Sequence, residues 1–111
     1  MDNIKNDSYY AKQIVDNISA IKRYISNKTY EQFVKDEELI DAVMFRLIQL
    51  VENIKKISFD FKEKHQNIPW GKIMGFRNGI VHEYDKTDYV IVYETAMQDL
   101  DDLQVLFEEI L

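Results

Sequence analysis

The chain has no cysteine, one proline and three glycines among its 111 residues. Without cysteine it can form no disulfide, no thiolate nucleophile and no thiolate zinc site. All three glycines lie between residues 71 and 79, so little elsewhere interrupts regular structure. No apolar run approaches the length of a membrane span, and the first residues lack the apolar core of a signal peptide. We therefore expect a single cytoplasmic, mainly helical domain covering residues 1–111.

The net charge is −6, whereas a general nucleic-acid binder is usually basic. The charge is unevenly distributed, however. Residues 54–77 have a local balance of +4, and residues 83–111 have a balance of −8. Either stretch can simply be a solvated helix face. The functional alternative is that the basic middle contacts RNA while the acidic tail meets a basic partner or limits which RNA can approach.

The spacing of apolar residues in the first half predicts two long helices and a short one. Isoleucines recur at steps of three and four from about Ser8 to Ser26, which indicates an amphipathic helix. Thr29 and Gln32 form a capping-box pattern that opens a short helix ending near residue 34. Asp36 then caps a long helix whose apolar arc is so wide that we expect it to be the most buried element.

The second half predicts two further helices. Residues 59–66 are interpreted as a polar connection anchored by two phenylalanines, and Pro69 suits the first turn of the next helix. A last helix is predicted from an Asp88 cap, because its apolar residues keep a strict four-three spacing: Tyr89, Tyr93, Ala96, Leu100, Leu103, Phe107 and Ile110. The prediction is an all-α, antiparallel four-helix bundle with one short additional helix.

The segment 76–84 concentrates an obligate cation, a titratable imidazole and a phenol. Arg77 stays charged and offers a planar fork of donors to phosphate oxygens, while His82 can transfer a proton near neutral pH. Cleavage of a phosphodiester by the neighbouring 2′-hydroxyl requires charge neutralisation and proton transfer, so these residues suggest a metal-independent ribonuclease. The alternative is that both residues only interact with the dipole at a helix C-terminus.

The five-residue spacing limits how Arg77 and His82 can act together. On one continuous helix they would be rotated by about 140° and separated by about 7.5 Å along the axis. Either the helix ends between them, near Gly79, or the site is shared by two subunits of a homodimer. In a dimer, one His82 would act as base and its symmetry mate as acid.

Residues 67–84 resemble the signature of HepT-like toxins of the HEPN superfamily. That signature has Arg, four residues, His, one residue and Tyr, matched here by Arg77, His82 and Tyr84, with Asn78 completing an Arg-Asn pair and an upstream Pro-Trp. The resemblance covers most of the chain, although Val51 stands where the family often has glycine.

The resemblance implies the helical HEPN fold and a ribonuclease toxin of a type VII-like toxin–antitoxin module. It implies that an MntA-like nucleotidyltransferase, the antitoxin, transfers AMP to Tyr84. From the residues alone, Tyr84 can equally order a loop through a hydrogen bond. Asn78 is interpreted as a supporting residue that orients the phosphate or His82. We expect no metal and no cofactor, and an RNA substrate that is either tRNA or mRNA.

Other candidate residues fit structural roles at least as well. His65 is expected to be a solvated loop residue rather than an RNA contact, and Trp70 a core anchor rather than a base-stacking platform. The two histidines lack metal-ligand spacing. Two rival classes stay open: a non-catalytic nucleotide- or RNA-binding helical dimer that binds a partner, and an inert structural dimer from a two-gene module.

Overall fold

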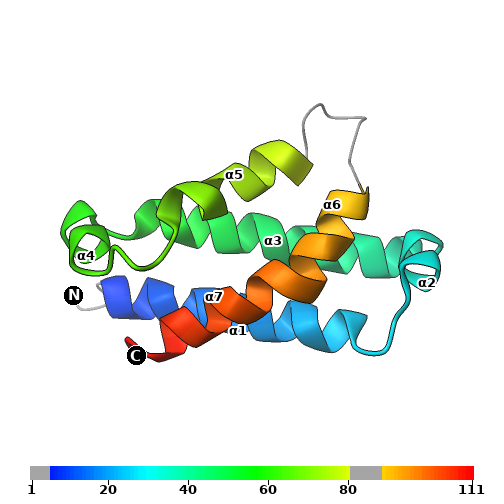
Figure 1. Ribbon diagram of the computed structural model, residues 1–111, viewed down its shortest axis with the longest axis horizontal. Helices are drawn as coiled ribbons and strands as arrows, with labels where there is room; N and C mark the ends of the chain where they lie inside the picture. Colours follow the sequence, from blue (N-terminus) through cyan, green and yellow to red (C-terminus); the bar gives the residue numbers. More distant parts are fainter. Residues whose placement is uncertain (1–5, 81–88) are drawn as a thin grey trace.

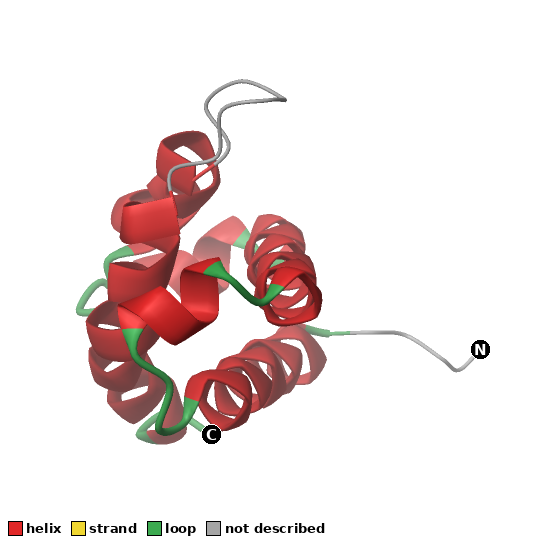
Figure 2. Ribbon diagram, turned by 90° about the vertical axis from the view of Figure 1, so that its right-hand side faces the viewer, coloured by secondary structure: helices red, strands yellow, loops and turns green. Residues whose placement is uncertain are grey.

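The computed structural model describes residues 6–80 and 89–111, with residues 76–80 described by their backbone alone. All regular structure within these ranges is helical, which confirms the predicted all-α class (Figure 2). No helix in the described part is both long and apolar enough to cross a membrane. The elements are α1 (Asp7–Ile25), α2 (Tyr30–Val34), α3 (Glu37–Lys56), α4 (Phe59–Lys64), α5 (Trp70–Ile80), α6 (Tyr89–Glu94), the π-helical turn η1 (Thr95–Asp99) and α7 (Leu100–Glu108).

The helix starts predicted from Thr29 and Asp36 are confirmed, whereas Asp88, the cap predicted for the last helix, lies outside the described residues. The Thr29 hydroxyl accepts a hydrogen bond from the Gln32 amide at 3.1 Å, and the Gln32 side chain accepts one from the Thr29 amide at 2.9 Å. This is a complete capping box at the start of α2. The Asp36 carboxylate likewise accepts the Leu39 amide of α3 at 3.0 Å.

The centre of the molecule is the pair formed by α1 and α3, which run side by side in opposite directions (Figure 1). Both helices bury one apolar stripe completely or nearly so, as their three-four spacing predicts. The buried apolar residues of the pair are Ala11, Ile14, Ile18, Ala20, Ile21 and Ile25 on α1 and Val43, Leu47, Leu50, Val51 and Ile54 on α3.

The remaining helices pack onto this pair. Helix α5 lies along α3, while η1 and α7 cross α1, and α6 contacts both α2 and α5 (Figure 1). They contribute a second set of buried side chains, which closes the core: Ile73, Val92, Ala96, Leu100, Leu103 and Phe107. The end of α5 is thereby placed near the start of α6.

The prediction of a polar connection over residues 59–66 is wrong, because the structure has helix α4 there. The Ser58 hydroxyl accepts the Phe61 amide at 3.1 Å and so caps the helix. Ser58 is itself held by the Asp7 carboxylate, which accepts its amide and its hydroxyl, both at 2.7 Å. The fold therefore has two short additional helices, α2 and α4, rather than the predicted one.

The last helix is also less regular than its apolar spacing predicts. Its middle is a π-helical turn in which the Leu100 amide reaches back to the carbonyl of Thr95, one residue further than in an α-helix. Thr95 is 3 % exposed there, although it is polar. The wider turn separates α6, which contacts α2 and α5, from α7, which contacts α1.

The wide apolar arc of α3 is only partly buried, so α3 is not the most buried element. Its main stripe is covered, but Ile48 on the second stripe is 38 % exposed and the neighbouring Phe45 is 58 % exposed. Helix α1 has more buried residues than α3. A prediction from the width of the apolar arc thus overestimates burial, because neighbouring helices cover only part of that arc.

The contrast between Ile54 and Ile48 on the same helix gives a test of this core. Ile54→Ala should lower the free energy of unfolding by about 2–5 kcal/mol, because Ile54 is 0 % exposed and its loss leaves a cavity. Ile48→Ala is the matched control and should cost about 1 kcal/mol or less. Urea denaturation of both variants measures the difference, and equal losses would contradict the packing described here.

Candidate active site

The candidate catalytic residues lie at the end of α5 and just beyond it. The backbone places Arg77 and Asn78 in the last two turns of this helix, with Arg77 about 10 Å along the axis from Trp70. His82 and Tyr84 lie outside the described residues, in the segment 81–88 that joins α5 to α6. A site within one subunit requires α5 to end between Arg77 and His82. The structure describes α5 as far as Ile80, so this alternative stays a prediction.

The start of α5 is fixed by Trp70, which supports its interpretation as a core anchor. Its indole Nε1 donates a hydrogen bond to the His65 carbonyl at 3.1 Å. The indole ring meets the buried Phe107 edge-on, with the ring centroids 5.6 Å apart. One turn later, Ile73 is 0 % exposed. The helix that carries Arg77 is therefore attached firmly at its first turn.

His65 has a local structural role in the structure. Its ring lies 4.5 Å from the Phe61 ring, centroid to centroid, and its carbonyl accepts both the Trp70 indole and the Ile68 amide. The predicted solvated loop position is thus half-buried at the end of α4. Within residues 6–80 and 89–111, no three acidic or histidine side chains are grouped as a metal site.

The described basic residues of the middle segment make separate local contacts. Lys55 is paired with Glu52 at 3.1 Å, and Lys72 approaches Asp99 at 3.9 Å. Lys62 lies over the Trp70 ring, 5.9 Å from its centroid. These lysines belong to three helices, α3, α4 and α5, and two of them already have an acidic neighbour.

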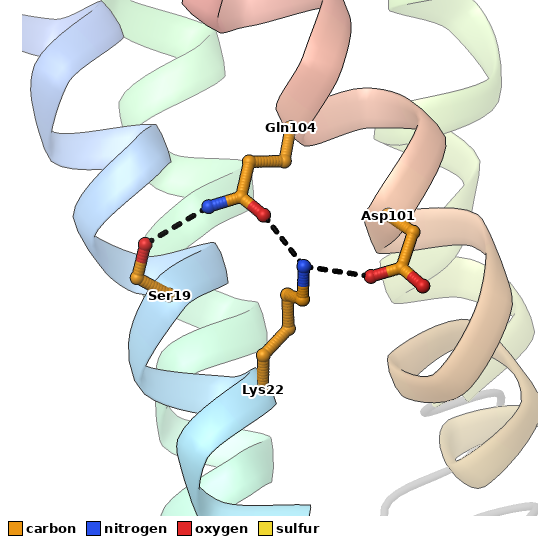
Figure 3. Close-up of polar contacts among 4 residues, drawn as sticks. All are labelled: Ser19, Lys22, Asp101 and Gln104. Carbon is orange, nitrogen blue, oxygen red and sulfur yellow. Dashed lines mark hydrogen bonds and ion pairs between the residues drawn. The ribbon is translucent and has the colours of Figure 1, made fainter. Parts of the chain in front are cut away.

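One residue of the acidic tail, Asp101, makes an ion pair within the fold (Figure 3). The Lys22 ammonium of α1 lies 2.8 Å from the Asp101 carboxylate and donates to the Gln104 side chain at 2.7 Å. The Gln104 amide nitrogen in turn donates to the Ser19 hydroxyl at 3.1 Å. This group joins α1 to α7. In the sequence its only signal is that Ser19 and Lys22, and likewise Asp101 and Gln104, are three residues apart and so share a helix face.

A second polar group that the sequence reasoning missed joins α1 to α3. The Arg46 guanidinium donates to the Asn17 side chain at 3.3 Å and to the Tyr24 hydroxyl at 3.2 Å. Asn17 is 4 % exposed although it is polar. The available signal was an asparagine next to the isoleucines that mark the buried face of α1.

Comparison with known proteins decides the family. A model of the family described as "Ribonuclease HepT-like" matches residues 14–110. The chain belongs to the HepT-like ribonuclease family of the HEPN superfamily. The resemblance read from the Arg77, His82 and Tyr84 pattern is therefore confirmed at the level of the family. That pattern lies inside the matched range.

Several HepT-like relatives cover nearly the same length as this chain. A protein of Caldanaerobacter subterraneus subsp. tengcongensis named "Putative RNase" is 31% identical over 108 residues, 97% of this chain and 96% of the relative. A "Putative RNase" of Methanocaldococcus jannaschii is 32% identical over 98 residues, 88% of this chain and 81% of the relative. A "Probable ribonuclease HepT" of Thermococcus cleftensis is 29% identical over 101 residues, 91% and 92% of the two chains. No solved structure matches this HepT-like chain.

Proposed function

We propose that this HepT-like protein is an endoribonuclease that cleaves RNA without a metal ion, through attack by the 2′-hydroxyl. The observation that carries the proposal is the Arg77, Asn78, His82 and Tyr84 pattern within the region matched by the family. A firmly attached α5 supports it, because catalytic side chains need a rigid element beneath them.

Arg77 would bind the scissile phosphate. In the reaction the 2′-oxygen forms a bond to phosphorus, and the bond from phosphorus to the 5′-oxygen breaks. Negative charge accumulates on the non-bridging oxygens as the 2′-oxygen adds, and a guanidinium aimed at these oxygens stabilises it. Its planar fork allows two parallel hydrogen bonds to one phosphate, which an ammonium group cannot provide in the same geometry.

His82 would handle the protons. One imidazole accepts the proton of the 2′-hydroxyl, and an imidazolium gives a proton to the leaving 5′-oxygen. The products are a 2′,3′-cyclic phosphate and a 5′-hydroxyl. Asn78 would orient the phosphate or His82. Because each chain has one His82, we propose a homodimer in which the two motifs face one cleft, so that base and acid come from different subunits.

We propose further that the protein is the toxin of a HEPN/MNT toxin–antitoxin module and that AMP transfer to Tyr84 silences it. Tyr84 is two residues from His82, so a nucleotide on its hydroxyl would place a phosphate beside the catalytic residues. That phosphate would compete with the substrate phosphate for Arg77. We also propose that α1, α3, α5 and the α6–α7 helix form the antiparallel HEPN-type bundle, which the opposed directions of α1 and α3 support.

The first test of this function is RNA cleavage in EDTA by the unmodified protein. His82→Ala should reduce the rate by roughly 10²- to 10⁴-fold, the usual contribution of a positioned acid or base. His65→Ala is the matched control and should retain activity, since the His65 side chain packs on Phe61. Arg77→Lys should also be impaired, because a point charge does not replace the fork.

Gel analysis of end-labelled RNA gives these rates, and the product ends identify the chemistry. Wild-type activity that persists unchanged in purified His82→Ala would rule out the mechanism. An inactive wild-type protein that still binds RNA would instead indicate the rival class, a non-catalytic binding module.

The shared cleft is tested by mixing two inactive variants. Arg77→Ala and His82→Ala subunits, allowed to exchange, should regain part of the activity. The heterodimer cleft keeps one Arg77 and one His82, and so either the base or the acid, whereas each parent homodimer lacks one of the two residue types altogether. Two separately purified batches of Arg77→Ala serve as the control mixture and should stay inactive. A protein that is monomeric by light scattering at the assay concentration would contradict the arrangement.

The silencing proposal is tested by co-expression with the MntA-like nucleotidyltransferase. Intact mass should rise by one or more AMP units, and the increase should disappear in Tyr84→Phe but not in the nearby control Tyr89→Phe. Tyr84→Phe should keep its ribonuclease activity, since the phenol takes no part in the proposed chemistry. Modification of any other tyrosine, or none at all, would show that this switch is wrong even if the nuclease is real.

A further inference from the structure

Helix α1 uses two opposite sides to contact its neighbours. Ser19 and Lys22 face α7 and bond to it (Figure 3). Asn17 and Tyr24 are seven residues apart and therefore lie on one face, about 180° around the helix from the side of Ser19 and Lys22. The junction of α1 with α3 at Asn17 and Tyr24 thus lies on the side away from α7.

Arg46 of α3 is held at this junction by several fixed contacts. Its Nε donates to the Tyr24 hydroxyl at 3.2 Å, and its Nη1 donates to the Asn17 Oδ1 at 3.3 Å. Asn17 is oriented in turn by donating its own amide to the Gln13 carbonyl at 3.0 Å. The guanidinium carbon also lies 5.9 Å from the centroid of the Tyr24 ring. The arginine is therefore held in place before any ligand arrives.

The donors of this group are not all used. A guanidinium has five N–H groups, and the described contacts of Arg46 occupy two of them. The Tyr24 hydroxyl accepts from Arg46, which leaves its own proton available for donation. Among the described residues no carboxylate lies within ion-pair distance of Arg46, although the chain has 20 acidic residues. Among the described basic residues, Lys22, Lys55 and Lys72 have an acidic neighbour, whereas Arg46 and the others have none.

Such a group suits a phosphate. A half-buried, oriented arginine beside a hydroxyl donor offers convergent hydrogen bonds to the oxygens of one anion. Structural cross-linking of α1 and α3 explains the two bonds that Arg46 already makes. It leaves three N–H groups of the Arg46 guanidinium for a ligand.

We propose that Arg46 and Tyr24 form a phosphate-binding site on the α1–α3 face, and that this site holds the backbone of a bound RNA strand outside the Arg77 and His82 centre. The RNA assignment rests on the proposed ribonuclease function. Asn17 is a positioning residue in this site, because it touches Arg46 and not the ligand. The site would add affinity for RNA without taking part in the bond cleavage.

The test is equilibrium binding of a single-stranded 2′-O-methyl oligouridylate, which lacks the attacking hydroxyl and cannot be cleaved by this chemistry. Arg46→Gln should weaken binding on the order of tenfold and lower the slope of log affinity against log salt by about 0.7, the value for one phosphate on a single strand. Tyr24→Phe, which keeps the ring, should weaken binding less. The charge-matched control is Arg23→Gln, exposed on the same helix as Tyr24, and the hydroxyl control is Tyr30→Phe.

Thermal unfolding of each variant separates loss of the site from loss of the fold, and Arg46→Lys supplies a second variant that keeps the charge. A folded Arg46→Gln with wild-type affinity and salt slope would overturn the proposal, as would an equal loss in Arg23→Gln. A changed oligomeric state with unchanged RNA affinity would show that Arg46 binds a carboxylate of a second copy instead. If inorganic phosphate shifts the Arg46 Nε–H resonance while RNA affinity stays independent of Arg46, the RNA assignment is wrong.

Cleavage of ordinary RNA is measured separately on the same proteins, so the two proposals fail independently. If Arg46→Gln loses RNA affinity and the wild-type protein does not cleave RNA, the phosphate-binding site stands and the nuclease proposal is wrong. If the wild-type protein cleaves RNA normally and RNA affinity does not depend on Arg46, the nuclease proposal stands and the Arg46 site is wrong.

Discussion

The burial of α1 against α3 is the constraint on which the other helices depend. Each fully buried isoleucine, leucine or valine in this contact contributes about 1.5–3 kcal/mol relative to its exposed state. Neither helix offers a complete core alone, because each also presents apolar residues to a third partner. Helix α5 covers a further part of α3, and α7 packs on α1. Arg77 and Asn78 are on α5, which packs directly on α3, so a cavity between α1 and α3 would disturb α5 as well.

Polar contacts then determine how the helices are aligned. Lys22 reaches α7 through Asp101 and Gln104, and Arg46 reaches α1 through Asn17 and Tyr24. Apolar stripes alone permit several rotations and shifts of one helix against another, whereas a hydrogen-bonded pair is satisfied in few of them. Side-chain exposure reduces what the Lys22 pair adds to stability, so its contribution is mainly to geometry.

The sequence predicted the helices well where local chemistry decides them. The Thr29 and Gln32 capping box and the Asp36 cap depend on residues three positions apart, and both were correctly identified. Helix α4 was missed because its phenylalanines suggested anchors for a loop, and because the bond from Ser58 to Asp7 joins residues 51 positions apart. The π-helical turn was missed because no glycine or proline marks it.

For the candidate site, too, the sequence predicted what is local and missed what is long-range. Arg77, Asn78, His82 and Tyr84 were found because they are close together in the sequence, and the family match confirms the kind of protein to which such a motif belongs. Contacts such as that of Lys22 with Gln104, 82 residues apart, exist only once the chain has folded. Sequence periodicity reports which face of a helix is apolar, but it does not report which partner covers that face.

The anchoring of α5 by Trp70 also makes the protein its own optical probe. The chain has a single tryptophan, and its indole is half-buried between Phe61 and Phe107 at the first turn of the helix that carries Arg77. Its fluorescence therefore comes from one known place, without interference from other indoles. Emission wavelength and quenching by iodide would follow the docking of α5 in solution directly, with no label attached near the candidate catalytic residues.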